Sequence, residues 1–369
     1  MTTQPAFVDS VQNRIDEVMR AGHADVSAIG RDAESLSTVA GTLVKGGKRF
    51  RARLAYWGWR AAVTYGDPLV DADRHPHADL VASLAAGLEL FHAAALVHDD
   101  IIDNSDTRRG TPAAHRQFEA IHTERNYVGD AGLYGRSSAI LLGDLLLAWA
   151  DDQFMTVSLG LEADRRDDFR TELRTMRTDV TAGQFLDNHD SSAWQTIGDD
   201  VAVERAQRVV IYKSAKYSVE APIALGAIIG GAAPALVSAL RAFALPLGFA
   251  FQMRDDLLGV FGEPSVTGKP AGDDLREGKR TVLLAMARRH ADRSTVNILD
   301  ELVGDPSLDD DQITMLRATL TSTGAVDAVE DLIERSRERS LRALDELALD
   351  PAVDRELRGL VDAVTNRAV

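Results

Sequence analysis

The sequence predicts an all-α protein in which residues 1–369 form a single domain. Alternating strand patterns are scarce, and Gly and Pro fall mainly between helical segments. The pattern indicates about a dozen helices packed in one large bundle. Apolar residues recur at the helical spacings of three and four in residues 6–29, 52–65, 78–98, 138–160, 165–187, 200–220 and 310–347.

The core of this bundle must be aliphatic, because hydrophobic residues make up 45% of the chain and aromatic residues only 6%. Gly and Pro clusters at 66–68, 108–112 and 230–234 mark the breaks between helices. Residues 119–137 and 262–278 are rich in polar residues or glycine and are predicted to be long loops. In compact domains such loops are often lids or binding loops.

One long apolar stretch, residues 221–253, tests whether the chain spans a membrane. Gly230-Gly231 marks a turn within it, and Pro234 and Pro246 interrupt it further. No uninterrupted run reaches the ~20 residues of a typical spanning helix. We therefore expect two buried helices here and no membrane span.

Charge and composition exclude several function classes. The net charge of −16 disfavours binding to nucleic acid or to anionic membranes, although local Arg and Lys can still bind anionic substrates. The chain has no cysteine, which excludes disulfides, thiolate catalysis and cysteine zinc sites. The N-terminal stretch lacks the apolar core of a signal peptide, so a cytoplasmic location is expected.

The stretch VHDDIIDNSDTRRG, residues 97–110, places dense negative charge at the end of an apolar helix. Asp99 and Asp103 share one helical face at the i, i+4 spacing. Their mutual repulsion and the helix dipole both disfavour this placement. A divalent cation such as Mg²⁺, which prefers oxygen ligands and shares its shell with phosphates, would remove both penalties. The alternative is a solvated acidic helix end.

Basic residues near the aspartates suggest a diphosphate-binding site. Arg108 and Arg109 follow the motif closely, and guanidinium groups bind phosphate oxygens bidentately. VKGGKRFRARL, residues 44–54, adds a second basic cluster, with glycines that allow the backbone to approach a ligand. Its alternative interpretation is a basic helix start. GKPAGDDLREGKRT, residues 268–281, is not a Walker A loop because the glycine spacing differs.

Together these stretches resemble the trans-isoprenyl diphosphate synthases, or polyprenyl synthetases, over roughly residues 40–285. GGKRFR, ELFHAAALVHDDIIDNSDTRRG, GQFLD, YKSAKYS, FQMRDDLLG and GKPAGDDLREGKRT occur in the family's order. The resemblance, most marked to geranylgeranyl diphosphate synthases, implies an all-α homodimer with a central cavity in each subunit. It also implies head-to-tail condensation of isopentenyl diphosphate with an allylic diphosphate, with about three Mg²⁺ ions per active site.

The resemblance assigns the residues that hold metal and the allylic diphosphate. Asp99 and Asp103 match the metal ligands of the first aspartate motif, Asp100 matches their supporting residue, and Asp255 matches the ligand of the second motif. Isolated lysines are most often surface residues, so these assignments rest on the motifs. The residues that match the allylic diphosphate site and its cavity are Arg108, Lys213, Lys269, Lys279, Gln184 and Gln252.

The isopentenyl diphosphate site is matched by Gly47, Lys48, Arg51, His92 and Arg109. His92 by itself would more often be a core histidine, and only its place before the first aspartate motif argues otherwise.

Two positions depart from the family's pattern. Gly259 stands where many members have the last aspartate of the second motif, and activity is expected to survive because the first aspartate makes the essential contact. The C-terminus lacks the basic tail of some members, and Arg367 is a candidate substitute.

Product length is predicted from small and large residues before the first motif. Ala94 and Ala95 precede Asp99 by about one turn and are too small to stop chain growth at C15. Phe91, one turn deeper, would close the pocket one isoprene unit later, which favours C20. If Phe91 instead packs between helices, longer products become possible.

Two other functions remain open. A terpene cyclase shares the ionising aspartates but does not need the isopentenyl diphosphate residues, all of which are present. A non-catalytic partner subunit of a heteromeric synthase would be expected to lose aspartates or basic residues, and only Gly259 points that way.

Overall fold

The computed structural model describes residues 4–67, 70–263 and 272–366. Two compact units contain these residues, and each is built from two separate stretches of chain. The first unit comprises residues 1–172 and 222–234, and the second comprises residues 173–221 and 235–369. That these two units together form the single domain expected from the sequence stays a prediction.

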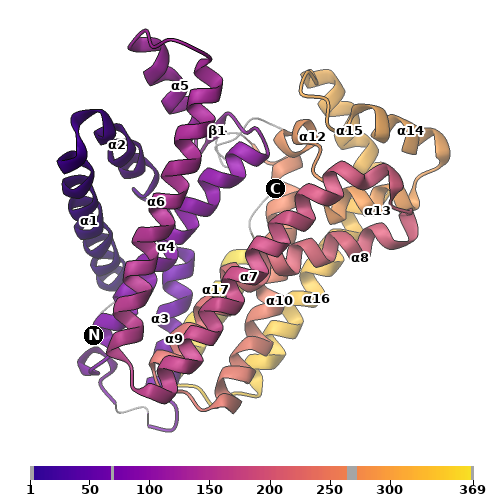
Figure 1. Cartoon of the computed structure of the whole chain (residues 1–369). Coiled ribbons are helices and arrows are strands. Elements are labelled where there is room, and N and C mark those ends of the chain that lie inside the picture. The colour runs from indigo at the N-terminus through magenta and orange to yellow at the C-terminus, as the bar shows by residue number, and fades with distance from the viewer. Residues whose placement is uncertain (1–3, 68–69, 264–271, 367–369) are drawn as a thin grey trace. The chain divides into compact units, whose positions relative to one another are not determined.

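The first unit contains the helices α1 to α6, the start of α7 and α9 (Figure 1). The long helix α4 lies at its centre and packs against α1, α3, α5 and α6. More than half of its apolar residues are buried. The bounds are α1 (Gln4–Ile29), α2 (Glu34–Leu43), α3 (Phe50–Val63), α4 (Ala78–Ile102), α5 (Ala114–Glu124), α6 (Ala131–Gly160), α7 (Ala163–Ala193) and α9 (Ala221–Ile229).

A two-stranded hairpin is the sole sheet among the described residues. It joins β1 (Thr107–Arg108) and β2 (Thr111–Pro112) directly after α4. Arg109 and Gly110 form its two-residue turn, and both have positive φ (54° and 74°). This is the backbone combination of a type I′ turn, which suits the twist of a tight hairpin.

The second unit contains most of α7, then α8 and the remaining C-terminal helices. A π-helix (Val210–Glu220) continues α8, and α13 packs against both α8 and α16. Arg254 on α10 pairs with Glu330 on α16, which ties the two helices together. The bounds are α8 (Asp199–Val209), α10 (Pro234–Phe261), α12 (Asp273–Glu277), α13 (Val282–His290), α14 (Arg293–Leu302), α15 (Asp310–Ser322), α16 (Ala325–Asp345) and α17 (Pro351–Thr365).

In the part of the chain that the structure describes, three short 3₁₀ turns connect helices, at Arg31–Ala33, Ala72–Arg74 and Trp194–Thr196. The seven periodic segments are all helical, which confirms the predicted fold class. The described residues form sixteen α-helices rather than about a dozen, because short helices such as α12 and α14 carry little periodic signal.

The prediction of a loop at 119–137 was wrong. α5 continues to Glu124, and α6 begins at Ala131, so a short connection separates them. The side chain of Asp130 accepts a hydrogen bond from the Leu133 backbone nitrogen (2.8 Å) and thereby caps α6. The polar composition of this stretch reflects exposed helical faces. Of the second expected loop, residues 272–278 contain α12, and residues 264–271 lie outside the described residues.

The apolar stretch at 221–253 forms two helices, α9 and α10, as expected. However, α10 runs through Pro246 without ending there. By length and composition alone, α4 and α10 are each apolar enough to cross a bilayer, with 72% and 44% of their most apolar windows buried in the structure. Since core helices pass the same test, this is weak evidence about a membrane.

Candidate active site

The first aspartate motif lies at the C-terminal end of α4, where the sequence placed it. Asp99 is in the last turn and Asp103 is the residue that caps the helix. Asp99 and Asp103 are partly exposed, whereas Asp100 is buried. The motif therefore presents two carboxylates on the accessible face and keeps the third inside the first unit.

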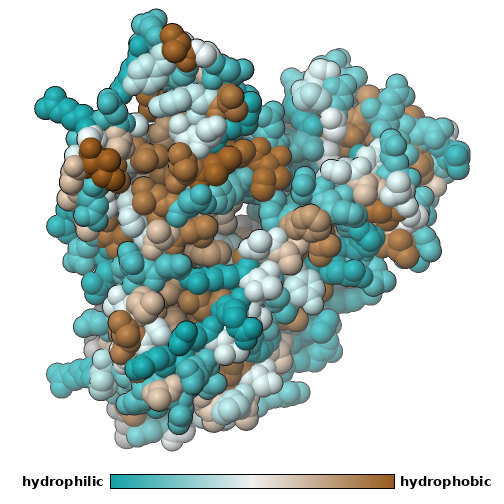
Figure 2. All heavy atoms as spheres, viewed as in Figure 1, coloured by the Kyte–Doolittle hydropathy of each residue, from teal (hydrophilic) through white to brown (hydrophobic). Residues whose placement is uncertain are grey.

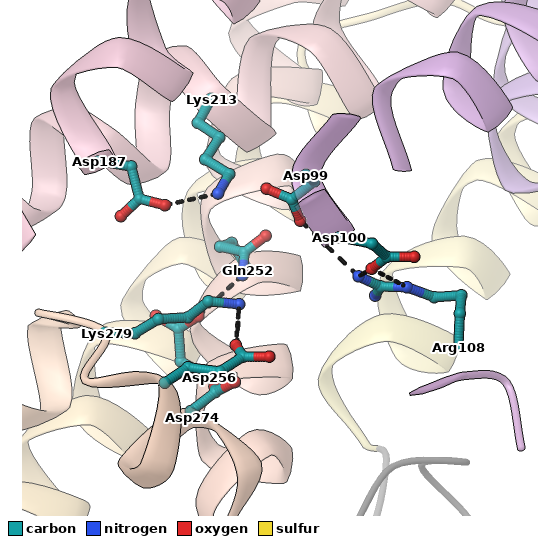
Figure 3. Close-up of polar contacts among 10 residues, drawn as sticks. Asp99, Asp100, Arg108, Asp187, Lys213, Gln252, Asp256, Asp274 and Lys279 are labelled. Atoms are coloured by element: carbon teal, nitrogen blue, oxygen red, sulfur yellow. Dashed lines mark hydrogen bonds and ion pairs between the residues drawn. The ribbon is translucent and has the colours of Figure 1, made fainter. Parts of the chain in front are cut away.

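Asp100 holds Arg108 in place. The Arg108 guanidinium donates to one Asp100 carboxylate oxygen from both Nε (2.9 Å) and Nη2, and Nη2 also lies 3.8 Å from Asp99 (Figure 3). Because β1 carries Arg108, the hairpin turns the arginine back toward the helix end. Asp106 pairs instead with Arg116 (2.7 Å).

The basic loop between α2 and α3 meets the hairpin turn. A Cβ atom on Gly47 would lie 3.3 Å from Nη1 of Arg109, and Gly47 itself has a φ of +91°. Both the close approach and the backbone conformation favour glycine at this position. Lys48 is exposed on the same loop. The structure thus brings together three of the residues expected to bind isopentenyl diphosphate.

His92 lies within the electrostatic field of four arginines. Burial lowers its pKa well below the ordinary value, and Arg51, Arg109, Arg108 and Arg49 lower that pKa further. Burial also lowers the pKa of Arg109. Such a concentration of positive charge favours an anion with several negative charges.

Arg49 and Glu89 form a buried ion pair near His92 that was not expected from the sequence. Arg49 is buried in a left-handed conformation (φ 46°) and donates to Glu89 (3.2 Å) and to the Val44 carbonyl (2.6 Å). Glu89 also accepts from the backbone nitrogen of Ala52 (3.3 Å). A lone glutamate within the apolar run of α4 was the available signal, because a buried carboxylate requires a cationic partner.

The residues expected to control product length separate by burial. Ala94 is fully buried and Phe91 is 7% exposed, whereas Ala95 is partly exposed. At 100° per residue, Ala95 is also closer than Ala94 or Phe91 to the helical face of Asp99. Their roles in product length stay predictions.

In the second unit, Lys213 projects from the π-helix. Its Nζ lies 2.5 Å from an Asp187 oxygen on α7 (Figure 3). A Cβ on Gly183 would lie 2.3 Å from the Lys213 backbone nitrogen, so glycine permits this close contact. Gln184, next to it, has a buried Nε2 with no hydrogen-bond acceptor among the described residues. A long π-helix is rare and such segments are frequent at functional sites.

The second aspartate motif lies near the C-terminal end of α10. Asp255 is exposed, whereas Asp256 is buried and accepts a hydrogen bond from Gln252 (2.8 Å). Burial raises the pKa of Asp256 well above its ordinary value, and the neighbouring Asp274 and Asp255 raise that pKa further. Lys279 contacts Glu277 (2.8 Å) and Asp274 (3.8 Å). Gln252 is thus bound to the motif itself.

Two predicted residues lie outside the described residues, namely Lys269 and Arg367. Asp187, Asp256, Asp274 and Glu277 are contacts of the predicted site that the sequence analysis did not single out. All four are carboxylates beside predicted cations or aspartates. Three of them lie within the motifs GQFLD and GKPAGDDLREGKRT, and Asp256 lies within FQMRDDLLG.

The carboxylates of the two aspartate motifs fit a Mg²⁺ ion whose other ligands are phosphate oxygens and water. Among residues 4–67, 70–263 and 272–366, no group of three or more metal-binding side chains is arranged around one point. Mg²⁺ in phosphate chemistry is usually held by one or two carboxylates, with phosphate oxygens and water completing the shell. Asp99 with Asp103, and the exposed Asp255, are donor sets of that kind.

Comparisons with known proteins show which family the chain belongs to. The family model for polyprenyl synthetase matches residues 33–320. The chain is 32% identical over 287 residues to a geranylfarnesyl diphosphate synthase of Aeropyrum pernix, covering 78% of this chain and 81% of that protein. A geranylfarnesyl diphosphate synthase of Natronomonas pharaonis is 31% identical over 78% of this chain and 74% of its own length.

Among solved structures, a geranylgeranyl pyrophosphate synthase from Corynebacterium glutamicum, complexed with isoprenyl diphosphate and magnesium, is 38% identical. It covers 98% of this chain and 99% of its own, with a TM-score of 0.89. The chain belongs to the polyprenyl synthetase family. Within that family it is an enzyme, a trans-isoprenyl diphosphate synthase.

Proposed function

We propose that this enzyme condenses isopentenyl diphosphate head-to-tail with an allylic diphosphate in a Mg²⁺-dependent reaction, and that its main product is C20 geranylgeranyl diphosphate. The observation that carries the proposal is the positive charge that Arg51, Arg108 and Arg109 place near His92, on the helix that ends in the first aspartate motif. A terpene cyclase does not require a second diphosphate site, so this positive charge favours condensation.

Basic residues bind the two diphosphates, and acidic residues hold the metal. Arg51, His92 and Arg109, with Lys48, bind the diphosphate of isopentenyl diphosphate. Arg108 and Lys213, with Lys269 and Lys279, bind the allylic diphosphate and stabilise the charge that develops when it leaves. Asp99, Asp103 and Asp255 hold Mg²⁺, which neutralises the leaving diphosphate. Apolar helix walls exclude water from the allylic cation.

The product length is the most specific part of the proposal, because similar proteins are named for products of different length. Two relatives are geranylfarnesyl diphosphate synthases, and a solved neighbour is a geranylgeranyl pyrophosphate synthase. The neighbour matches a larger share of the chain at higher identity, which supports C20. A C25 or longer product, or a C15 product, is the alternative.

A homodimer is proposed as the functional form. The exposed face of α6 carries apolar side chains along its length, at Leu133, Ile140, Leu141, Met155 and Leu159. Figure 2 shows apolar side chains gathered over the region that α6 occupies in Figure 1. An apolar stripe of this length marks an interaction surface. A cytoplasmic location and the absence of nucleic-acid partners complete the proposal.

The test incubates purified protein with Mg²⁺, labelled isopentenyl diphosphate and separate C5, C10 and C15 primers. A predominantly C20 product that disappears with a metal chelator is expected. Hydrocarbon release without isopentenyl diphosphate would favour a cyclase. Absence of turnover with every primer would favour a non-catalytic partner subunit. Products of another length would refute C20 while leaving the condensation in place.

A further inference from the structure

Gly259 lies inside α10, at the position four residues after Asp255, and its side-chain space is occupied by another residue. A Cβ atom on Gly259 would lie 2.0 Å from Oδ2 of Asp274, 2.5 Å from its Cγ and 3.0 Å from its Oδ1. The whole carboxyl group of Asp274 therefore fills the place of a side chain at 259. Gly259 has no positive φ, so the helical backbone does not itself require glycine.

The position of this carboxylate matters because residues i and i+4 of a helix share a face. In the first motif, Asp99 and Asp103 present two carboxylates at this spacing from one helix. In the second motif, α10 supplies Asp255 on that face but no carboxylate at the i+4 position, and Asp274 reaches the i+4 place from α12. Asp274 acts electrostatically on Asp256 and lies 3.8 Å from Lys279. It is mostly buried, with a side chain 13% exposed.

From this geometry we infer that Asp274 replaces the missing last carboxylate of the second aspartate motif. The absence of a side chain at Gly259 leaves the space that the Asp274 carboxyl group occupies. Asp274 is a positioning residue: it supplies negative charge beside Asp255 and faces Lys279. The inference rests on the proposed function for the role of Asp255 in holding Mg²⁺. It explains why the departure at Gly259 need not remove the charge of the motif.

A double-mutant cycle tests the pair without relying on turnover. Gly259→Asp should lower the free energy of unfolding in metal-free buffer, because its carboxylate would overlap and repel that of Asp274. Asp274→Ala in the same chain should relieve most of that loss. Gly259→Ala meets the same atoms without the charge, and keeps the cycle measurable if Gly259→Asp does not fold. Asp273→Ala, next to Asp274, is the matched control and should not relieve either variant.

The second readout is the Mg²⁺ concentration that gives half of the thermal stabilisation measured with inorganic diphosphate. Asp274→Ala should raise this concentration about tenfold, and Gly259→Asp with Asp274→Ala should return it to within about threefold of the wild-type value, where tenfold corresponds to about 1.4 kcal/mol. Additive effects in the metal-free cycle, or an unchanged midpoint in Asp274→Ala, would overturn the inference. If the wild-type protein shows no Mg²⁺ response, the proposed function fails, while the metal-free cycle still decides whether the two residues exchange.

Discussion

The carboxylates in and just after the first aspartate motif are expected to contribute differently to stability, because they differ in burial. Asp100 has a side chain 4% exposed and pairs with Arg108, whereas Asp106 is 63% exposed and pairs with Arg116. Removing one member of a buried ion pair leaves an uncompensated charge, but removing a member of an exposed pair does not.

Asp100→Asn should therefore lower the free energy of unfolding by about 3 kcal/mol, because Arg108 would keep its charge without its carboxylate. Asp106→Asn, three residues after the motif, is the control and should cost less than about 1 kcal/mol. Urea denaturation of the two variants measures the difference. Equal losses would mean that burial does not distinguish the pairs.

The neutral state of His92 predicts a pH dependence of stability. Its pKa in the folded protein lies below the ordinary value of 6.5, so the unfolded chain binds more protons below that pH. The contribution is present above about pH 6.5 and is lost as the pH falls toward the folded pKa. Between about pH 7.5 and about pH 5.5, one such histidine accounts for roughly 1 kcal/mol.

His92→Gln should remove that share of the acid destabilisation, as measured by urea denaturation at the two pH values. His75 and His115 also have lowered pKa values, so the wild-type slope contains their contributions too. The difference between variant and wild type isolates His92. An identical loss in both proteins would show that His92 is protonated in the folded state.

At the scale of elements, close helix crossings depend on glycine. A Cβ on Gly226 of α9 would lie 1.9 Å from the Ala55 carbonyl oxygen of α3, and a Cβ on Gly58 of α3 would lie 2.1 Å from the Ile223 carbonyl oxygen. Backbone atoms cannot move aside as a flexible side chain can. The two glycines therefore fix the distance between α3 and α9.

Gly226→Ala should destabilise the protein by at least about 2 kcal/mol, because the added methyl group forces the helices apart. Gly359→Ala is the matched control, since this exposed position on α17 has nothing within 4 Å of a new Cβ. It should gain about 0.5–1 kcal/mol from higher helix propensity. Thermal denaturation compares the two, and a loss in both would contradict the crossing argument.

The α4 helix also carries the prediction about product length. Phe91→Ala should lengthen the products, because it removes the largest side chain proposed to close the pocket. Leu90→Ala is the control on the same helix: Leu90 is fully buried and lies about 180° from the face of Asp99. Chromatography of the labelled products measures chain length. Unchanged C20 from Phe91→Ala, or equal lengthening from Leu90→Ala, would contradict the assignment.

For the whole molecule, the apolar stripe on α6 predicts self-association. Leu141→Lys, at a side chain 61% exposed, should shift the protein toward monomer, since a buried unpaired charge is costly at an interface. Ile29→Lys is the control, because Ile29 is 84% exposed at the end of α1 and outside the stripe. Sedimentation velocity measures the oligomeric state. A monomeric wild type, or dissociation by Ile29→Lys alone, would refute the proposed surface.

The sequence by itself determined the all-α class, because periodicity at three and four residues is a local property of the chain. It also determined the first motif and its basic neighbours, because Asp99, Asp103, Arg108 and Arg109 lie within a few turns of one another. The stretch at 119–137 was misread because exposed helical faces and loops have similar composition.

Only the tertiary structure decided the contacts between residues far apart in sequence. It paired Arg49 with Glu89, placed Asp187 against Lys213, and brought Asp274 into the space of Gly259. None of these follows from local spacing, because each depends on how helices pack. The sequence shows that Gly259 lacks a side chain, but only the tertiary structure shows that Asp274 occupies that volume.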